Sequence, residues 1–225
     1  MRARKRKRNA DGIFEIKVPD FLLKAAAARN QSHAAQLLYK LDGLNAPNQE
    51  LMASGVRQIL MGMGVDLDDV NFSGTPDRVA KLYAEMLTPQ VNNWKTFPAT
   101  TSDMVILRNH RVIALCPHHL MPAVISCSVG YIPHKLTLGL SKLARAVEEQ
   151  LTKPILQEDL ANAVAEKLNK VLEPKGCGIV LVGTHGCMKF RGVESDGDVV
   201  TSVMKGVLLL NPAARMEFLQ LIGRP

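Results

Sequence analysis

Residues 111–119, RVIALCPHH, join a short apolar run to a cluster of side chains that can bind a metal. A second apolar run, residues 179–182, leads in the same way to His185-Gly186-Cys187. Each run has the length and composition of a buried β-strand. A strand end can hold a reactive side chain rigidly at the mouth of a cleft. We therefore expect the two clusters to belong to one site.

Cys116, His119 and Cys187 have the side chains and the spacing of a metal site. Cys116 and His119 are three residues apart, near enough to grip one ion, and Cys187 can supply a third ligand. Three protein ligands leave one coordination position open, as in catalytic zinc sites. His118 and His185 would then be free for proton transfer. In the competing interpretation the cysteines are small buried hydrophobes and the histidines are structural, but two Cys/His clusters at strand ends favour a metal.

Length and composition predict one sizeable core with an N-terminal appendage in a chain of 225 residues. The sequence shows no apolar run of membrane-spanning length and no signal-like apolar segment at its start. We therefore expect a soluble protein of the cytoplasm. Its four cysteines do not look like a secreted disulfide framework, and in a reducing compartment they favour metal binding or catalysis.

The net charge of +7 is concentrated at the N-terminus. Residues 1–8 contain six of the 28 basic side chains, which leaves 22 against 21 acidic ones in the rest of the chain. Such a basic run can contact nucleic acid or an anionic surface. Because no aromatic residues are interleaved for base stacking, we expect a solvated, disordered tail over residues 1–12 and no nucleic-acid partner.

The order of elements predicts an α+β fold with an antiparallel sheet. Helical spacing of apolar residues and cap signals predict helices over residues 48–62, 75–86, 141–152, 155–172 and 211–221. An alanine-rich piece, 21–39, can also be helical. Apolar runs between turn signals predict strands over residues 104–107, 112–115, 124–132, 177–184 and 199–210. Thr75 and Ser141 are the expected N-caps of their helices.

Three helix starts carry polar residues that can bind an anion or a base. Arg78 lies in the first turn of its helix, where the dipole disfavours a cation unless an anion is near; a surface arginine is the default. Lys142 and Arg145 share a helix face near its start, which suits a polyanion and equally suits two solvated side chains. Gln157 and Glu158 can cap their helix or present a carboxylate to a purine edge.

Seven motifs, in this order and spacing, resemble the GTP cyclohydrolase I family. They are Thr75-Pro76-Asp77-Arg78-Val79-Ala80, Cys116-Pro117-His118-His119, Tyr131-Ile132-Pro133, Gly139-Leu140-Ser141-Lys142-Leu143-Ala144-Arg145, Gln157-Glu158, His185-Gly186-Cys187-Met188 and Arg191-Gly192-Val193. The match runs from about residue 50 to the C-terminus, and residues 1–47 have no counterpart. The resemblance implies a tunnelling fold: an antiparallel sheet with two helices packed on one face, plus N-terminal helices. We expect an N-terminal extension over 1–47, a helical region over 48–98 and a catalytic domain over 99–225.

The resemblance also implies an activity and an assembly. Family members hydrolyse GTP to 7,8-dihydroneopterin triphosphate and formate, the first step toward tetrahydrofolate and other pterins. They form a homodecamer of two stacked pentamers, with active sites at subunit junctions. By matching motif, Cys116, His119 and Cys187 would bind Zn²⁺, which would activate a water for attack on C8 of the guanine. His118 and His185 would transfer protons during opening of the imidazole ring.

The resemblance assigns the substrate-binding residues as well. Glu158 would anchor the base with Gln157 beside it, and Arg78 would reach the triphosphate from a neighbouring subunit. The triphosphate would otherwise be held by Ser141, Lys142, Arg145 and Arg191.

Departures from the family pattern leave alternatives open. Pro117 stands where many members have an acidic residue, Gly186 replaces a bulkier one, and residues 153–159 depart from the usual pattern, so a modified guanine nucleotide remains a candidate substrate. A related pterin synthase would bind zinc through three histidines, and a nitrile reductase of deazaguanine synthesis would use a nucleophilic cysteine without zinc. A non-catalytic zinc protein that binds nucleic acid would need a fourth ligand, Cys127 or Cys177.

Overall fold

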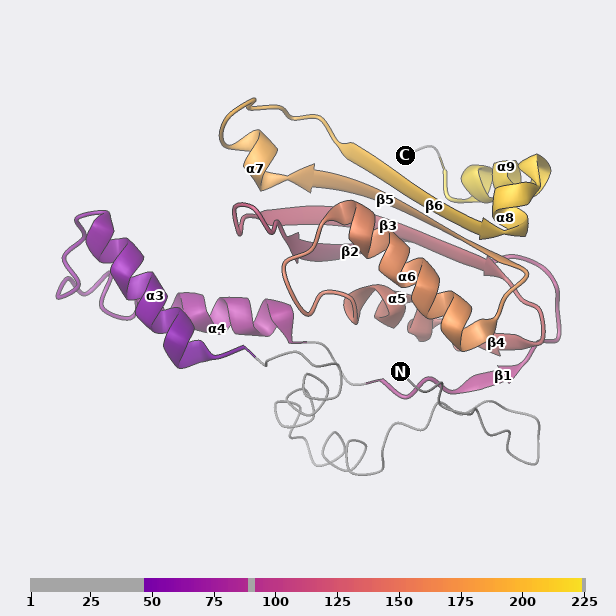
Figure 1. The fold of residues 1–225 in the computed structure, drawn as a ribbon, viewed down its shortest axis with the longest axis horizontal. Helices are drawn as coiled ribbons and strands as arrows, with labels where there is room; N and C mark the ends of the chain where they lie inside the picture. The colour runs from indigo at the N-terminus through magenta and orange to yellow at the C-terminus, as the bar shows by residue number, and fades with distance from the viewer. Residues whose placement is uncertain (1–46, 89–91, 224–225) are drawn as a thin grey trace, which may run out of the picture.

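The computed structural model describes residues 47–88 and 92–223. Its centre is a four-stranded antiparallel sheet in the order β2-β3-β5-β6 (Figure 1). The strands are β2 (Val105–Leu115), β3 (Pro122–Ile132), β5 (Gly176–His185) and β6 (Val199–Gly206). This arrangement confirms the predicted α+β class with an antiparallel sheet. The predictions of a solvated basic tail and an alanine-rich helix lie outside the described residues.

Helices α5 (Ser141–Glu148) and α6 (Gln157–Leu172) cover one face of this sheet (Figure 1). Side chains alternate along β3, so every second residue from Ile125 to Tyr131 points to that face and is buried. From α6, Leu160, Val164 and Leu168 meet them and are 0% exposed. Each such side chain contributes roughly 1.5–3 kcal/mol by leaving water. This core fixes both strand ends and helix starts in one rigid frame.

The other face of the sheet is covered at one end by α8 (Val207–Leu210) and α9 (Pro212–Leu221) (Figure 1). Phe218 of α9 is fully buried there. Two strand glycines make room for its ring, because a Cβ on Gly130 or on Gly178 would lie 2.9 Å from Phe218 ring atoms. The C-terminal segment is therefore packed into the fold and does not continue as a strand.

The predicted strand over residues 199–210 was wrong in its second half. β6 ends at Gly206, whose φ of 60° is in the left-handed region. A Cβ there would lie 2.3 Å from the carbonyl oxygen of Lys175, so the chain turns where a larger residue would clash. Residues Val207–Leu210 then form α8.

Three further predictions need correction. The expected strands 104–107 and 112–115 are one strand, β2, whose pairing with β3 shifts between Leu107 and His110. The helix expected to reach Thr152 ends at Glu148. Ser141 and Thr75 are the first residues of their helices rather than the N-caps; Leu140 and Gly74 occupy those positions without a side-chain hydrogen bond.

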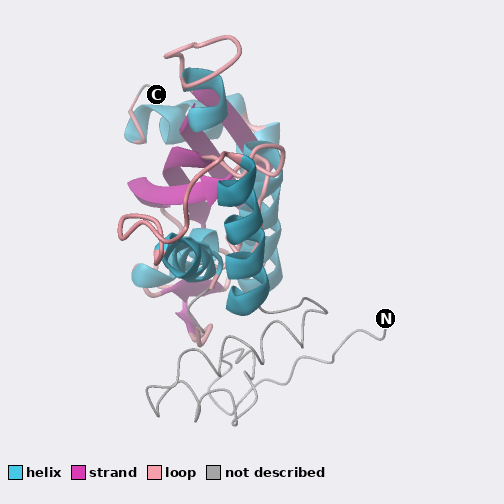
Figure 2. Cartoon of the chain, turned by 90° about the vertical axis from the view of Figure 1, so that its left-hand side faces the viewer, coloured by secondary structure: helices cyan, strands magenta, loops and turns pink. Residues whose placement is uncertain are grey.

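The N-terminal helices α3 (Gln49–Gly62) and α4 (Thr75–Leu87) pack on each other at one side of the sheet. Figure 2 looks at the chain from that side and shows helices in front of the strands. The side chain of Asn48 caps α3 by accepting from Leu51 N at 2.9 Å. A short ribbon, β1 (Thr96–Pro98) with β4 (Leu136–Leu138), closes the far end of the core. Within the described ranges no helix has the length and apolar character needed to cross a bilayer.

Candidate metal and nucleotide site

The two Cys/His clusters meet at one end of the sheet. The connection from β2 to β3 is a tight turn, closed by Cys116 N donating to Met121 O at 2.9 Å. At the start of β3, Ala123 pairs with His185, the last residue of β5. Helix α7 (Gly186–Lys189) follows directly and carries Cys187. Its close approach to β3 depends on Gly186, where a Cβ would lie 2.9 Å from the Pro122 carbonyl oxygen.

The candidate ligand atoms of Cys116, His119 and Cys187 all lie within 4.8 Å of one another. Cys116 Sγ is 3.7 Å from His119 Nδ1. Bonds of about 2.3 Å to sulfur and 2.1 Å to nitrogen around a tetrahedral zinc would separate two such ligands by about 3.6 Å. Two thiols and one imidazole are also the donor types that zinc favours. The residues present therefore fit a zinc ion with a fourth position left for water or substrate.

The other two cysteines belong to the core and not to this cluster. Burial raises the pKa of Cys127 to about 12 and that of Cys177 to about 11, which keeps both as neutral thiols. Cys177 lies at the opposite end of β5 from His185, about 26 Å along the strand. Burial and then the hydrogen bond with Cys116 raise the pKa of the Cys187 thiol, and a bound cation would act in the opposite direction.

Gln157 fixes the orientation of His185. The Gln157 side chain is 3% exposed and its Nε2 donates to Leu181 O, Val199 O and Thr201 Oγ1 at 3.3, 2.9 and 3.1 Å. Since an amide nitrogen must face those carbonyl oxygens, Gln157 Oε1 faces His185 Nε2 at 2.8 Å and accepts its hydrogen. The lone pair of neutral His185 is therefore on Nδ1.

The predicted contact of Gln157 with a base remains a prediction. The structure shows in addition that Gln157 orients the His185 ring. The position of Gln157 in the first turn of a helix did not suggest this role. The backbone explains the placement: Ile155 N donates to Leu115 O at 3.0 Å, which brings the start of α6 to the metal end of the sheet. Gly183 leaves space for the amide, since a Cβ there would lie 2.1 Å from Gln157 Oε1.

His118 and Arg191 also lie beside the cluster. The exposed His118 ring stands edge-on to His119, with centroids 6.2 Å apart. Arg191 Nη1 donates to His119 Nε2 at 2.6 Å. A metal on Nδ1 would leave the hydrogen of His119 on Nε2, which then cannot accept from a guanidinium. Metal binding through Nδ1 and this Arg191 contact therefore exclude each other.

Ser141, Lys142 and Arg145 lie elsewhere in the same chain. β3 has 11 residues and leads away from the metal end over about 36 Å. α5 begins after it, beyond β4, and its eight residues return about 12 Å. Figure 1 shows α7 at one end of the sheet and β4 at the other. The start of α5, which carries the predicted triphosphate residues, thus lies toward the β4 end of the sheet, whereas the residue after its last turn, Glu149, shares a cleft with Pro117.

The sequence as a whole matches the family model described as GTP cyclohydrolase I over residues 52–223. The chain belongs to the GTP cyclohydrolase I family. It is 37% identical to GTP cyclohydrolase 1 of Rhodopirellula baltica over 80% of this chain and 83% of that one. It is 38% identical to GTP cyclohydrolase 1 of Aquifex aeolicus over 79% of this chain and 98% of that one. Among solved structures, the archaeosine synthase QueF-Like in the apo form gives a TM-score of 0.40 at 21% identity, over 48% of this chain and 97% of that one.

This GTP cyclohydrolase I family member has the tunnelling fold expected from its motifs, with two helices on one face of the antiparallel sheet. Two predicted substrate residues lie at helix starts. Arg78 Nη2 donates to Asn71 O and Thr75 Oγ1 at 3.1 and 3.0 Å, so the side chain folds over the start of α4. Glu158 is exposed in the first turn of α6, next to Gln157.

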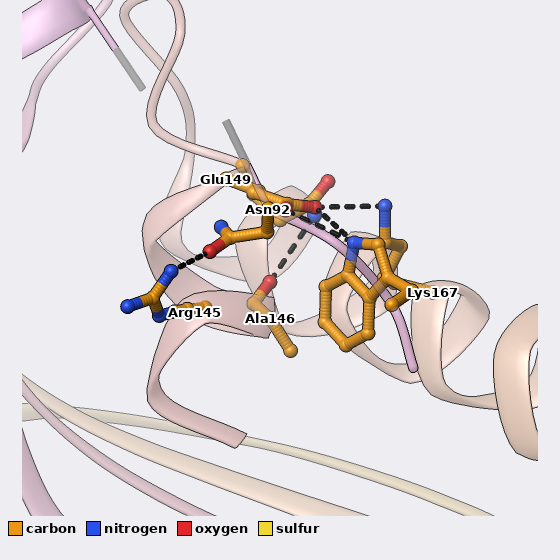
Figure 3. Close-up of polar contacts among 7 residues, drawn as sticks. Asn92, Arg145, Ala146, Glu149 and Lys167 are labelled. Carbon is orange, nitrogen blue, oxygen red and sulfur yellow. Dashed lines mark hydrogen bonds and ion pairs between the residues drawn. The ribbon is translucent and has the colours of Figure 1, made fainter. Parts of the chain in front are cut away.

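A polar network around α5 was not predicted from the family motifs (Figure 3). Trp94 Nε1 donates to Glu149 Oε1 at 3.0 Å, and Lys167 Nζ pairs with Glu149 Oε2 at 2.7 Å. Arg145 donates to the Asn92 side-chain oxygen. The single tryptophan of the chain was the available signal, because a buried indole normally needs a partner for its N–H.

A cleft of about 660 Å³ opens beside the turn that carries the ligands. Among the described residues that line this cleft, none is one of the three candidate ligands. Pro117 forms part of its wall, and the remainder comes from Glu149, Gln150, Thr152, Lys153, Pro154, Ile155, Leu156, Asp159 and Ala163. Within the Cys/His cluster itself, Cys116 is buried, Cys187 is half-buried and His119 is exposed.

Proposed function

We propose that this chain is a zinc-dependent GTP cyclohydrolase I that converts GTP and water into 7,8-dihydroneopterin triphosphate and formate. The observation that carries the proposal is the cluster of Cys116, His119 and Cys187 at a strand end, with two histidines beside it. Membership of the GTP cyclohydrolase I family supplies the substrate. We also propose the cytoplasm as its compartment, which suits four unpaired cysteines.

The chemistry requires a nucleophile at guanine C8 and protonation of the imidazole ring. When bound, zinc supplies a Lewis acid that activates water for this attack. His185 is oriented by Gln157 so that Nδ1 is the atom that takes or gives a proton. His118 is exposed next to His119 and is the second proton carrier. Glu158 anchors the base through its carboxylate, and the carbon lost from C8 leaves as formate.

The triphosphate needs several cations, and these come from two places in the fold. Arg191 lies at the metal end, whereas Ser141, Lys142 and Arg145 lie on α5. Burial and then the nearby Arg145 guanidinium lower the pKa of Lys142, while Glu149 raises it. Two crowded cations are relieved by a polyanion. Since the start of α5 lies toward the other end of the sheet in one chain, we infer that a complete site combines the metal end of one subunit with α5 of another.

From this separation we infer that the chain forms a homo-oligomer. In the family this oligomer is a decamer of two pentamers. The sheet also leaves β2 and β6 as outer strands, and unpaired strand edges favour association with another copy. Arg78 on α4 is proposed to reach the triphosphate of a neighbouring subunit. The mass of the particle in solution, compared with the 24.6 kDa of one chain, measures the number of copies.

Co-expression of two inactive chains tests the shared site. We expect Cys187→Ser to remove the metal half and Arg145→Ala to remove the phosphate half, so each alone releases little formate from GTP. In randomly mixed oligomers about one quarter of the sites combine two intact halves, so activity returns to about that fraction. Mixing the two variants without subunit exchange is the control. A mixed oligomer as inactive as its parents would contradict the shared site.

A further inference from the structure

Glu149 is placed to pair with Arg145 but has other partners. The two residues are four apart at the end of α5, the spacing at which opposite charges on a helix attract. Glu149 instead accepts from Trp94 Nε1 at 3.0 and 3.1 Å and pairs with Lys167 Nζ at 2.7 Å. Its side chain is 13% exposed, so these contacts are shielded from water. The carboxylate four residues beyond Arg145 is thus engaged elsewhere, and Glu148, three residues beyond it, lies 3.3 Å from His110 Nε2.

Trp94 and Lys167 together fix the position of the Glu149 carboxylate. Trp94 is 3% exposed and its indole ring lies 4.7 Å from Lys167 Nζ, a cation–π contact. Lys167 comes from α6, and Trp94 from the segment before β1, so two separate elements converge on Glu149. Figure 3 shows Lys167 facing Glu149, while Arg145 points toward Asn92.

Arg145 is consequently not neutralised by Glu149, and its positive charge can act on a bound anion. Its guanidinium donates to the Asn92 side-chain oxygen, a neutral acceptor that orients the group without neutralising it. Lys142 lies one turn earlier on the same helix, so two cations stand close together near the start of α5. A carboxylate paired with Arg145 would compete directly with a bound polyanion at this place.

We propose that Trp94 and Lys167 are positioning residues of the triphosphate site, which hold the Glu149 carboxylate away from Arg145 and so leave that guanidinium for the phosphates. The inference rests on the proposed function in one respect, namely that Arg145 binds the triphosphate. It adds four residues to the site: Asn92, Trp94, Glu149 and Lys167. None of them touches the reacting atoms, so their effect is on binding and not on the chemical step.

The test is Lys167→Met, which keeps an apolar stem against Trp94 and removes the charge. Glu149 then loses its ionic partner and turns to Arg145. We expect KM for GTP to rise about three- to fivefold, the size expected for a partly exposed ion pair, with kcat changed less than twofold. Calorimetric titration with inorganic tripolyphosphate, which lacks the base, should show the same loss of affinity, and the loss should shrink as salt is raised.

Rescue separates this role from a merely structural one. Adding Glu149→Gln to Lys167→Met removes the competing carboxylate, so affinity for tripolyphosphate should return to within about twofold of the wild type. Lys205→Met is the matched control, because Lys205 is 32% exposed against 28% for Lys167 and also pairs with a glutamate, Glu166. It should leave affinity unchanged.

Two results from the variants would overturn the inference: unchanged tripolyphosphate affinity in Lys167→Met, or a double variant weaker than the single one. Neither depends on turnover. If the wild type binds tripolyphosphate but releases no formate from GTP, the proposed activity fails while the binding comparison still decides the inference. A wild type that does not bind tripolyphosphate contradicts the inference itself.

Discussion

Cys187→Ser is expected to purify with less than about a tenth of the zinc of the wild type and to release formate from GTP at least about a thousandfold more slowly. A serine hydroxyl stays protonated near neutral pH and is a far poorer zinc ligand than a thiolate. Cys116 and His119 would remain as two ligands, too few to hold the ion in a defined geometry. Zinc per chain is measured by elemental mass spectrometry, and formate by an enzymatic assay.

Cys177→Ser is the control for that experiment. Its sulfur is fully buried in the core, at the opposite end of β5 from the metal cluster. The control removes a thiol from the core and leaves the metal cluster untouched, so zinc content and formate release should match the wild type. A Cys187→Ser protein with one zinc per chain would contradict the assigned ligand set.

His185→Ala is expected to lower kcat by about 10²–10⁴-fold while keeping bound zinc. The variant removes the imidazole that Gln157 orients and leaves all three ligands in place. Gln157→Met should lower kcat by about 10–100-fold, because His185 loses the partner that fixes its orientation; partners that orient metal-bound histidines have effects of that size. Steady-state formate release over a range of GTP concentrations separates kcat from KM.

Gly183→Ala gives an independent version of the same change. Its Cβ would lie 2.1 Å from Gln157 Oε1 and must displace the amide from His185. We therefore expect its kcat to fall in the direction of Gln157→Met. If Gln157→Met instead raises KM for GTP and leaves kcat unchanged, Gln157 binds the base directly and the positioning role is wrong.

The sequence predicted the parts of the fold that depend on local pattern. Apolar runs between turn signals, two of them ending in Cys/His clusters, correctly indicated buried strands whose ends meet. Strand pairing between Ala123 and His185 is what makes two motifs nearly 70 residues apart in sequence neighbours in space. The apolar run 199–210 misled because the single backbone turn at Gly206 decides where strand becomes helix.

Contacts between segments far apart in the sequence could not be predicted from local sequence patterns. Gln157 was predicted to cap its helix or to lie beside the base, yet it is buried against three acceptors from β5 and β6. Trp94 and Glu149, 55 residues apart, gave no periodic signal of their contact. The separation of the start of α5 from the metal end likewise follows from the length of β3, which matters only once the strand is placed in a sheet.

Turnover of GTP by the zinc-loaded wild-type chain tests the central claim most directly. Formate and the fluorescence of the oxidised pterin product are followed in the same reaction. We expect both to appear in equal amounts, with one of each formed per GTP consumed. No formate from a chain that carries zinc and binds GTP would contradict it.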